Sequence, residues 1–197
     1  MIFTRQNFSE RQPKVTVCAS GRAMIALNEQ VVNAVECTPV TMTEDGEEHY
    51  EKREREQYAY DVCWLDGVGD QGDVLAAAKK AVTDEIVAYD QSPAVNGFIL
   101  NGAKVWLDKA TRVGLMNSTS IAKAMGQQTT TLWLGDVKIE VDCDKAIQLL
   151  SALEMYAIGC FNVTAAHKKA VAEMNFIESV LLYNYTVDYP EMLTMSV

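Results

Sequence analysis

The sequence has 197 residues, 49% apolar and 22% charged, and its 27 acidic and 17 basic residues give a net charge of −10. This length can bury one sizeable core or two small ones. The acidic balance argues against a nucleic-acid groove, whose affinity comes from clustered Lys and Arg side chains. No apolar run approaches the roughly 18 residues of a membrane helix, and the N-terminus lacks a signal-peptide pattern. We therefore expect neither nucleic acid nor a membrane among the partners.

The five cysteines are too widely spaced to suggest a disulfide framework or a zinc site. They are Cys18, Cys37, Cys63, Cys143 and Cys160. Most of them lie in apolar runs, so we expect buried free thiols that behave as small hydrophobic side chains. Neither a metal nor a cofactor is predicted.

Residues 1–13 are polar and end at a proline, which predicts an N-terminal arm that is either loose or ordered only against a partner. Residues 14–66 predict an antiparallel β domain, because short β-branched runs alternate with turn residues such as Gly21 and Asn28. A hairpin at 44–57 carries the densest charge, with seven acidic and three basic residues. This hairpin is either a solvated arm or loop, or an arm that reaches a neighbouring subunit.

Residues 67–73 are a Gly/Asp junction whose three glycines formally match the GxGxxG pattern of dinucleotide sites. These glycines are surrounded by Asp66, Asp70 and Asp73, whose carboxylates would repel phosphate. A dinucleotide site also needs a parallel strand after the helix, and the sequence that follows the next helix indicates an antiparallel hairpin instead. A calcium loop is disfavoured because the spacing does not fit the twelve-residue pattern. We interpret the segment as a domain junction with a helix cap at Asp70 or Asp73.

Residues 74–197 predict an α+β domain, so the whole chain is expected to be α+β. A helix over 74–89 should cover one face of the sheet that follows. Two consecutive segments then predict the same unit: a strand, a two-residue turn, a second strand, an aspartate and a helix. The turn is Asn-Gly at 101–102 in the first unit and Gly-Asp at 135–136 in the second. The register of these turns predicts eight inward-facing side chains: Phe98, Leu100, Ala103, Val105, Leu132, Leu134, Val137 and Ile139.

The outer faces of these hairpins carry more apolar surface than a solvated sheet needs. Ile99, Trp106 and Trp133 alternate there with lysine and glutamate. Either a second layer of the same chain, such as the N-terminal β domain, covers them, or they mark a subunit contact, since Trp is favoured at the centres of interfaces.

Asp108 and Asp142 are predicted to cap the two helices of the repeated units. The first helix should bury one stripe: Ala110, Val113, Asn117, Ile121 and Ala124. The second has apolar residues largely at alternating steps of four and three as far as Met174, which predicts one helix of about eight turns, roughly 45 Å long. Such a helix outreaches the hairpins, so its C-terminal half should pack on another chain or on an aromatic, extended tail.

Tyr156 and His167 lie on the apolar stripe of this long helix. We interpret His167 as a core or interface histidine and not as a general base, because no nucleophile motif accompanies it. Together with the outer-face residues, these two complete a candidate interaction surface: Ile99, Trp106, Trp133, Tyr156 and His167.

Five short segments of the sequence resemble a known but uncharacterised domain family. This family occurs in phages and in prophages of gut bacteria, and it is often encoded near tail and tail-fibre genes. The five segments are AYDQSPAVN at 88–96, VWLDKATR at 105–112, TLWL at 131–134, AIQLLSALEMYA at 146–157 and YTVDYPE at 185–191. The likeness spans 88–193 and leaves 1–70 uncovered. The family has no assigned reaction and no catalytic residues, so the resemblance implies a context and not a site.

The resemblance implies a non-enzymatic structural component of a phage particle: a tail-associated adaptor, fibre-attachment or decoration protein. Its expected location is the virion tail, after assembly in the host cytoplasm, and its expected partners are other phage tail proteins and further copies of itself. No catalytic, cofactor-binding or metal-binding residue is predicted. The alternative is an acidic binding module of the host cell, either a tail-fibre assembly chaperone or an inhibitor that mimics nucleic acid. An enzyme using the glycines of 67–72 is the least favoured hypothesis.

Overall fold

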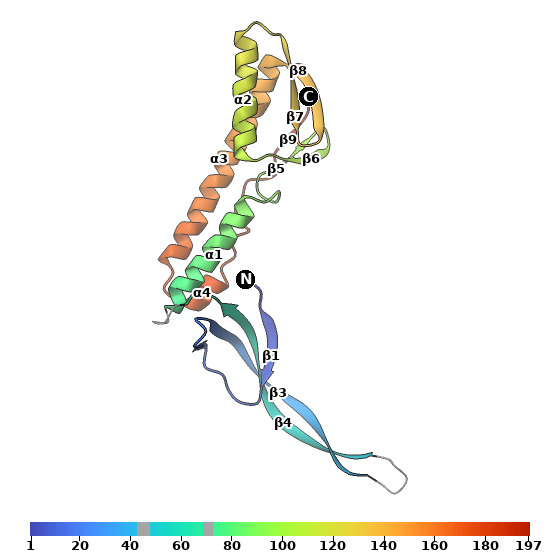
Figure 1. Cartoon of the computed structure of the whole chain (residues 1–197), viewed down its shortest axis with the longest axis vertical. Helices are drawn as coiled ribbons and strands as arrows, with labels where there is room; N and C mark the ends of the chain where they lie inside the picture. The colour runs from blue at the N-terminus through green and yellow to red at the C-terminus, as the bar shows by residue number, and fades with distance from the viewer. Residues whose placement is uncertain (43–47, 69–72) are drawn as a thin grey trace. The chain divides into compact units, whose positions relative to one another are not determined.

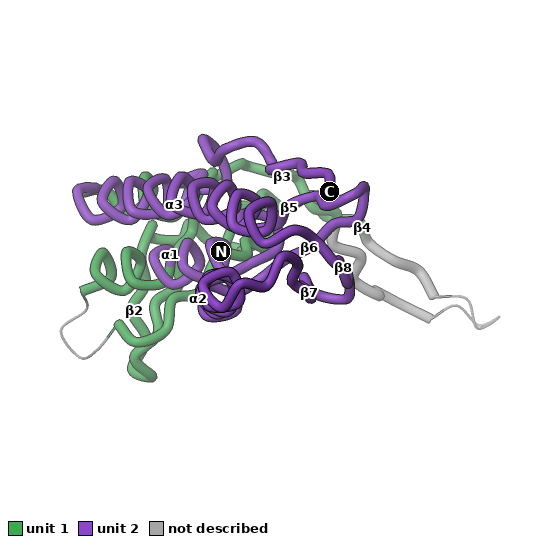
Figure 2. The backbone as a smooth tube through the Cα atoms, turned by 90° about the horizontal axis from the view of Figure 1, so that it is seen from above, with its two compact units in different colours: residues 1–81, 175–181 green, residues 82–174, 182–197 purple. Residues whose placement is uncertain are grey.

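The computed structural model describes residues 1–42, 48–68 and 73–197, and within strands it describes only the backbone of 36–42 and 48–51. The fold is α+β, as predicted, with an antiparallel N-terminal sheet and a long helix near the C-terminus (Figure 1). The chain forms two compact units (Figure 2). Unit 1 contains residues 1–81 and 175–181, and unit 2 contains residues 82–174 and 182–197.

Unit 1 is built on a four-stranded antiparallel sheet with the strand order β1-β4-β3-β2. Its strands are β1 (Thr4–Phe8), β2 (Val15–Val17), β3 (Ala23–Met42) and β4 (Glu48–Leu65). The buried part lies where all four strands meet, and Ala23, Ile25, Val62 and Leu65 are at most 2% exposed there. The short helix α4 (Ile177–Leu181) joins this unit through an ion pair between Lys14 and Glu178.

The N-terminal segment is not an arm throughout, because β1 pairs with β4 of the same chain in the register Thr4↔Val62 to Phe8↔Tyr58. Arg5 fixes this strand, since its guanidinium donates to Asp61 at 2.9 Å and to Gln30 at 2.6 Å. The prediction of an arm that is loose or held only by a partner is therefore wrong for these five residues. A polar strand at a sheet edge buries little, so its sequence lacks the apolar alternation that marks a strand.

The predicted turn at Asn28 is a β-bulge inside one long strand. Leu27 pairs with Asp61 and Gln30 pairs with Ala59, so two residues of β3 face one residue of β4. Asn28 has a φ of 55°, and its side-chain amide donates to Asp61 at 2.8 Å. Asparagine tolerates this left-handed conformation, which is why the segment has the sequence of a turn.

Helix α1 (Val74–Asp90) begins and ends close to its predicted bounds, and Asp73 caps it by accepting the Ala76 N–H at 2.9 Å. Asp70 and the rest of 69–72, and hence most of the predicted Gly/Asp junction, lie outside the described residues. The division between the units falls inside α1 and not before residue 74 as predicted. The reason is that Val74 lines the same shallow depression of unit 1 as Ile177 of α4.

Unit 2 contains the repeated units in the predicted order. The first consists of β5 (Gly97–Leu100), β6 (Ala103–Trp106) and α2 (Lys109–Ala124), and the second of β7 (Thr129–Leu134), β8 (Val137–Asp142) and α3 (Cys143–Glu173). Both hairpins have the predicted register. Asn101 and Gly102 have φ angles of 49° and 83°, as a type I′ turn requires.

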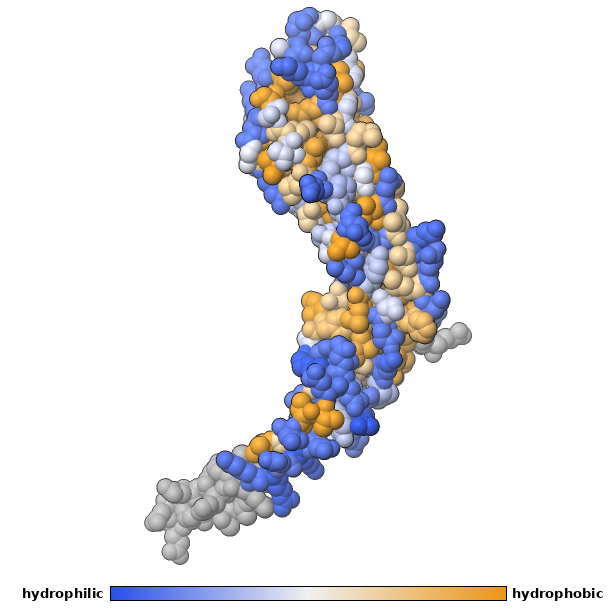
Figure 3. All heavy atoms as spheres, turned by 180° about the vertical axis from the view of Figure 1, so that it is seen from behind, coloured by the Kyte–Doolittle hydropathy of each residue, from blue (hydrophilic) through white to orange (hydrophobic). Residues whose placement is uncertain are grey.

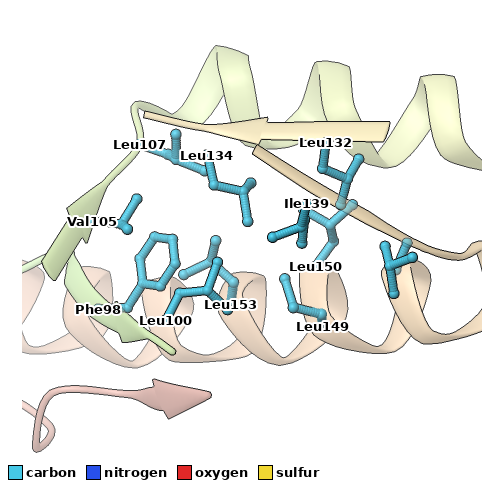
Figure 4. Packing of buried hydrophobic residues seen from close by; sticks show 12 residues of the cluster. Phe98, Leu100, Val105, Leu107, Leu132, Leu134, Ile139, Leu149, Leu150 and Leu153 are labelled. Atoms are coloured by element: carbon cyan, nitrogen blue, oxygen red, sulfur yellow. The ribbon is translucent and has the colours of Figure 1, made fainter. Parts of the chain in front are cut away.

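Six of the eight predicted inward side chains are buried; Ala103 is exposed and Val137 half-buried, because each follows directly after a turn. The hairpins pack their inner faces against α3 and form one apolar core (Figure 4). The buried members of this core are Phe98, Leu100, Val105, Leu107, Leu132, Leu134, Ile139, Val141, Ala146, Leu149, Leu150 and Leu153.

Both capping predictions are confirmed. The Asp108 carboxylate accepts the backbone N–H of Thr111 at 2.9 Å, and Asp142 accepts the N–H of Asp144 at 2.8 Å. The buried face of α3 also follows the predicted stripe, and α3 is one uninterrupted helix of 31 residues. The long periodic pattern therefore specified both the length and the orientation of this helix.

The predicted buried face of α2 is wrong. Ala110, Val113, Asn117, Ile121 and Ala124 are all exposed. The helix instead turns Arg112 and Thr119, 9% and 0% exposed, toward α3 and β7. Leu115 and Met116 of this face are half-buried and pack against the apolar core. The buried Arg112 between α2 and α3 was not expected, and its ion pair, described below, compensates its charge.

Within unit 2, α1 contacts α3 and the tail and not the hairpin face that it was expected to cover. Thr164 of α3 donates its hydroxyl to Asp90 at 2.8 Å, and Tyr89 packs edge-on against Tyr185 and Tyr189. The tail is extended and aromatic, as predicted, and it ends in an unpredicted strand, β9 (Thr194–Met195), parallel to β5. This tail satisfies the expectation that the C-terminal half of α3 needs a covering segment.

Candidate functional site

The five residues of the predicted interaction surface have different environments. Trp106 and Trp133 are 38% and 58% exposed, and no second layer of described residues covers them fully. Ile99 and Tyr156 are half-buried, and His167 is only 5% exposed. The structure therefore leaves the two tryptophans as the surface part of the set and gives Tyr156 and His167 internal roles.

His167 holds the aromatic tail on α3. Its Nε2 lies 3.0 Å from the carbonyl oxygen of Val187, and its Nδ1 lies 2.6 Å from the hydroxyl of Tyr183. Because a carbonyl only accepts, Nε2 donates to Val187, and Nδ1 shares a hydrogen bond with the Tyr183 hydroxyl. Both ring nitrogens are thus occupied within the chain, which matches the core alternative of the prediction and removes His167 from the interaction surface.

Tyr156 ties α3 to the segment that precedes β5. Its hydroxyl donates to the Val95 carbonyl oxygen at 2.6 Å, and the Cys160 thiol donates to the same oxygen at 3.4 Å. Burial raises the pKa of Tyr156 to about 12 and also raises the pKa of Cys160. Both groups therefore stay protonated at neutral pH and act as donors that hold the helix in place.

Trp133 lies on the outer face of the β7–β8 hairpin, where the ammonium of Lys138 lies 5.9 Å from the centre of its ring. Trp106, on β6, instead lines a groove of about 660 Å³ in unit 2. The groove residues come from the end of α1, the segment before β5, the junction of β6 with α2, and the middle of α3. They are Asp90, Gln91, Asn96, Trp106, Leu107, Asp108, Lys109, Arg112, Glu154, Ala157, Ile158 and Phe161.

An ion pair between a buried arginine and a half-buried glutamate lies in this groove. Arg112 donates from Nε to Glu154 at 3.1 Å and from Nη1 to the Leu107 carbonyl oxygen at 2.8 Å. The Arg112 side chain is 10% exposed and that of Glu154 is 36% exposed. Arg112 thus links α2 to α3 and to Leu107, which directly follows β6. The charges of Arg112 and Glu154 neutralise each other, so the pair adds little net charge.

The remaining groove carboxylates are Asp90 and Asp108. Hydrogen bonds from the hydroxyl and the backbone N–H of Thr111 hold the pKa of Asp108 below its usual range. Asp90 accepts a hydrogen bond from Thr164 but has no cationic partner among the described residues. The groove is thus a mixed surface of exposed aromatic rings and carboxylates, which fits recognition and contains no arrangement of a nucleophile beside a base.

Sequence reasoning found Trp106 but missed the groove. Ile158 and Phe161 are 45% and 63% exposed on α3, next to its buried stripe. Two exposed apolar residues three positions apart on a helix that is already amphipathic are a usable signal of a second contact face. The contribution of Asp90 and Arg112 depends on tertiary packing and leaves no such signal.

Three of the predicted buried cysteines, Cys63, Cys143 and Cys160, are buried free thiols, and Cys18 is half-buried. Burial raises the pKa of Cys63 to about 11. Within residues 1–42, 48–68 and 73–197, no three His, Cys, Asp or Glu side chains are grouped to hold a metal ion. Among the described helices, only α3 is long and apolar enough to cross a membrane by length and composition alone. The core helices of soluble proteins can be equally long and apolar, so this is weak evidence for a membrane span.

No protein-family model, no curated protein and no solved structure matches this chain.

Proposed function

We propose that this chain is a non-enzymatic structural component of a bacteriophage particle, a tail-associated adaptor, fibre-attachment or decoration protein that acts through protein–protein contacts. The phage context rests on the family resemblance of residues 88–193. The interaction role is supported by one observation above all, the shape of the β3–β4 pair in unit 1. Its partners are other tail proteins and further copies of this chain.

The β3–β4 pair extends far beyond the four-stranded sheet. β2 pairs only with 23–25 of β3, and β1 pairs only with 58–62 of β4. From Gln30 to Met42 and from Glu48 to Gln57, each strand therefore has one neighbour among the described strands. At about 3.3 Å per residue, this two-stranded ribbon is roughly 40 Å long. Neither outer edge of this ribbon has a further strand beside it in the described part of the chain.

The ribbon also lacks a buried face where its side chains are described. Val31 and Val35 lie on one face of β3 and are 52% and 57% exposed, and the facing residue of Val35, Glu54, is exposed as well. Hydrophobic and hydrophilic surface alternate on the side of the molecule drawn in Figure 3. A two-stranded ribbon alone is only marginally stable in water. A partner that adds a strand or covers the valines would stabilise it, which supports a role as a contact arm.

Mass spectrometry of purified particles from a host that carries the encoding phage tests the proposed location. We expect peptides of this chain at a fixed multi-copy ratio to known tail proteins. A chain with Val31→Thr and Val35→Thr keeps the strand propensity and should incorporate poorly. The matched control is Val17→Thr, a β2 valine that is 47% exposed outside the ribbon. Absence of the unaltered chain from particles refutes the proposal.

The net charge of −10 favours a second candidate, the acidic binding module of the host cell. Such a module would be absent from particles and would bind a basic host protein in a salt-dependent manner, because exposed charges are screened by salt. Pull-down from an infected lysate at low and high salt, followed by identification of the bound protein, separates the two candidates.

A further inference from the structure

The unit 2 groove exposes apolar side chains in a concave surface. Trp106, Ile158 and Phe161 are 38%, 45% and 63% exposed and come from two different elements, β6 and α3. Their neighbours Leu107 and Ala157 are 5% and 7% exposed. Recognition sites in proteins combine such an apolar lining with a few placed polar groups. The aromatic rings therefore define the part of the groove that an occupant contacts.

The charges in the groove favour a cationic occupant. Arg112 and Glu154 neutralise each other, which leaves Asp90 and Asp108 against Lys109. The whole chain carries a net charge of −10, so the surrounding field is also negative. Because the faces of aromatic rings attract cations, Trp106 and Phe161 reinforce the same preference.

One hydrogen-bond donor of the groove has no partner in the described part of the chain. Nη2 of Arg112 has no acceptor among the described residues, while Nε and Nη1 have theirs. Oδ1 of Asn96 also lacks a donor in the described part of the chain, but it is buried and does not face an occupant of the groove. A peptide backbone offers a carbonyl acceptor for this Nη2 donor, which a simple amine or a metal ion does not.

We propose that this groove receives an extended segment of a partner protein that carries an arginine beside an apolar side chain. The guanidinium stacks on Trp106 and donates to Asp90 or Asp108, and the apolar side chain packs on Ile158 or Phe161. Arginine fits better than lysine because its planar group can stack and form paired hydrogen bonds to a carboxylate. This inference deepens the proposed function by naming the chemistry of the partner.

Selection of a displayed random-peptide library on the immobilised full chain tests the proposal. We expect enriched peptides with arginine next to an aliphatic or aromatic residue. Replacing that arginine by citrulline, which keeps the shape and removes the charge, should weaken binding at least about tenfold, as loss of a desolvated charged contact does. In NMR titrations, the Trp106 indole signal should shift while those of Trp64 and Trp133 do not.

Variants of the chain locate the binding. Trp106→Ala and Phe161→Ala should each weaken binding about tenfold or more, and Asp90→Asn about threefold to tenfold. Asp90→Asn keeps an acceptor for Thr164, so the fold is retained. The matched controls are Trp133→Ala, an exposed strand tryptophan outside the groove, and Asp136→Asn, an exposed carboxylate in the β7–β8 turn. Both controls should bind as the unaltered chain does.

Enrichment of acidic peptides, no enrichment at all, or equal losses for Trp106→Ala and Trp133→Ala would overturn the proposal. So would concentration-dependent self-association that Trp106→Ala abolishes, because a second copy would then occupy the groove. The result is separable from the proposed function. A chain found in particles whose groove binds no such peptide refutes only the groove, and a binding groove in a chain absent from particles refutes only the tail role.

Discussion

The two antiparallel strand pairs β3–β4 and β7–β8 follow the same pairing rules and differ in what lies on their faces. In β7–β8, Leu132, Leu134 and Ile139 are at most 9% exposed because α3 packs on the inner face. In the outer part of β3–β4, Val31 and Val35 stay more than half exposed. Alternating apolar residues thus produce a core only where the chain supplies a covering element.

This difference separates the roles of the units. Unit 2 has a continuous core, whereas Val31 and Val35 in the ribbon of unit 1 stay more than half exposed. The contrast predicts large effects of substitutions in unit 2 and small effects in the ribbon when the chain is studied alone.

The largest effect is expected for Leu153→Ala in the unit 2 core. Leu153 is 1% exposed, so the substitution should lower the free energy of unfolding by about 2–5 kcal/mol. The matched ribbon variant Val35→Ala should change it by no more than about 0.5 kcal/mol. Denaturant unfolding followed by circular dichroism measures both. Equal losses of unfolding free energy in the two variants would contradict the proposed difference between the unit 2 core and the ribbon.

The ion pair between Arg112 and Glu154 sharpens the contrast within unit 2. Arg112→Met keeps the aliphatic stem but leaves Glu154 and the Leu107 carbonyl without their donor, so we expect a loss of about 1–3 kcal/mol. Lys109→Met, at an exposed position of the same helix, should have little effect. The double variant Arg112→Met with Glu154→Gln should cost less than the sum of the single changes if the pair is coupled.

Two glycines of unit 2 should respond with opposite signs. Gly102 has a φ of 83°, so Gly102→Val forces a β-branched residue into a left-handed conformation and should cost about 1–3 kcal/mol. Gly114 lies exposed in α2, and a methyl group added at its Cα would meet no atom within 4 Å. Gly114→Ala should therefore stabilise the chain by roughly 0.5–1 kcal/mol. Thermal melting of both variants tests the turn and the helix; a Gly102→Val chain that melts like the parent contradicts the turn assignment.

Ionisation of Tyr156 should lower the stability of unit 2 at alkaline pH. Burial raises its pKa from 10.0 to about 12, so the folded state favours the neutral phenol. The associated stability is fully present below pH 10 and is lost as the pH rises from 10 to 12. Tyr156→Phe should cost about 1 kcal/mol at neutral pH through the lost bond to Val95 and should flatten this alkaline limb. If the stability of the Tyr156→Phe variant falls as steeply between pH 10 and 12 as that of the parent, other groups cause the alkaline loss.

The sequence predicted the elements whose signals are local. Turn residues such as Asn101 and Gly102, the capping aspartates and the long stripe of α3 depend on neighbours within a few positions, and these predictions are confirmed. The face of α2 was mispredicted because Arg112 is buried by a partner 42 residues away. β1 and β9 were missed because edge strands carry little apolar alternation, and the groove was missed because its residues come from distant segments.

Amide hydrogen exchange of the isolated full chain tests the central claim most directly. We predict that the amides of β7 and β8 that bond across the hairpin exchange only through global unfolding. The cross-strand bonded amides within 30–35 and 52–57 of the ribbon should exchange at least about 100-fold faster. In assembled particles the ribbon amides should become protected while those of β7 and β8 change little. Ribbon amides as protected as those of β7 and β8, in a chain that is monomeric by sedimentation, would contradict the assignment of the ribbon as a contact arm.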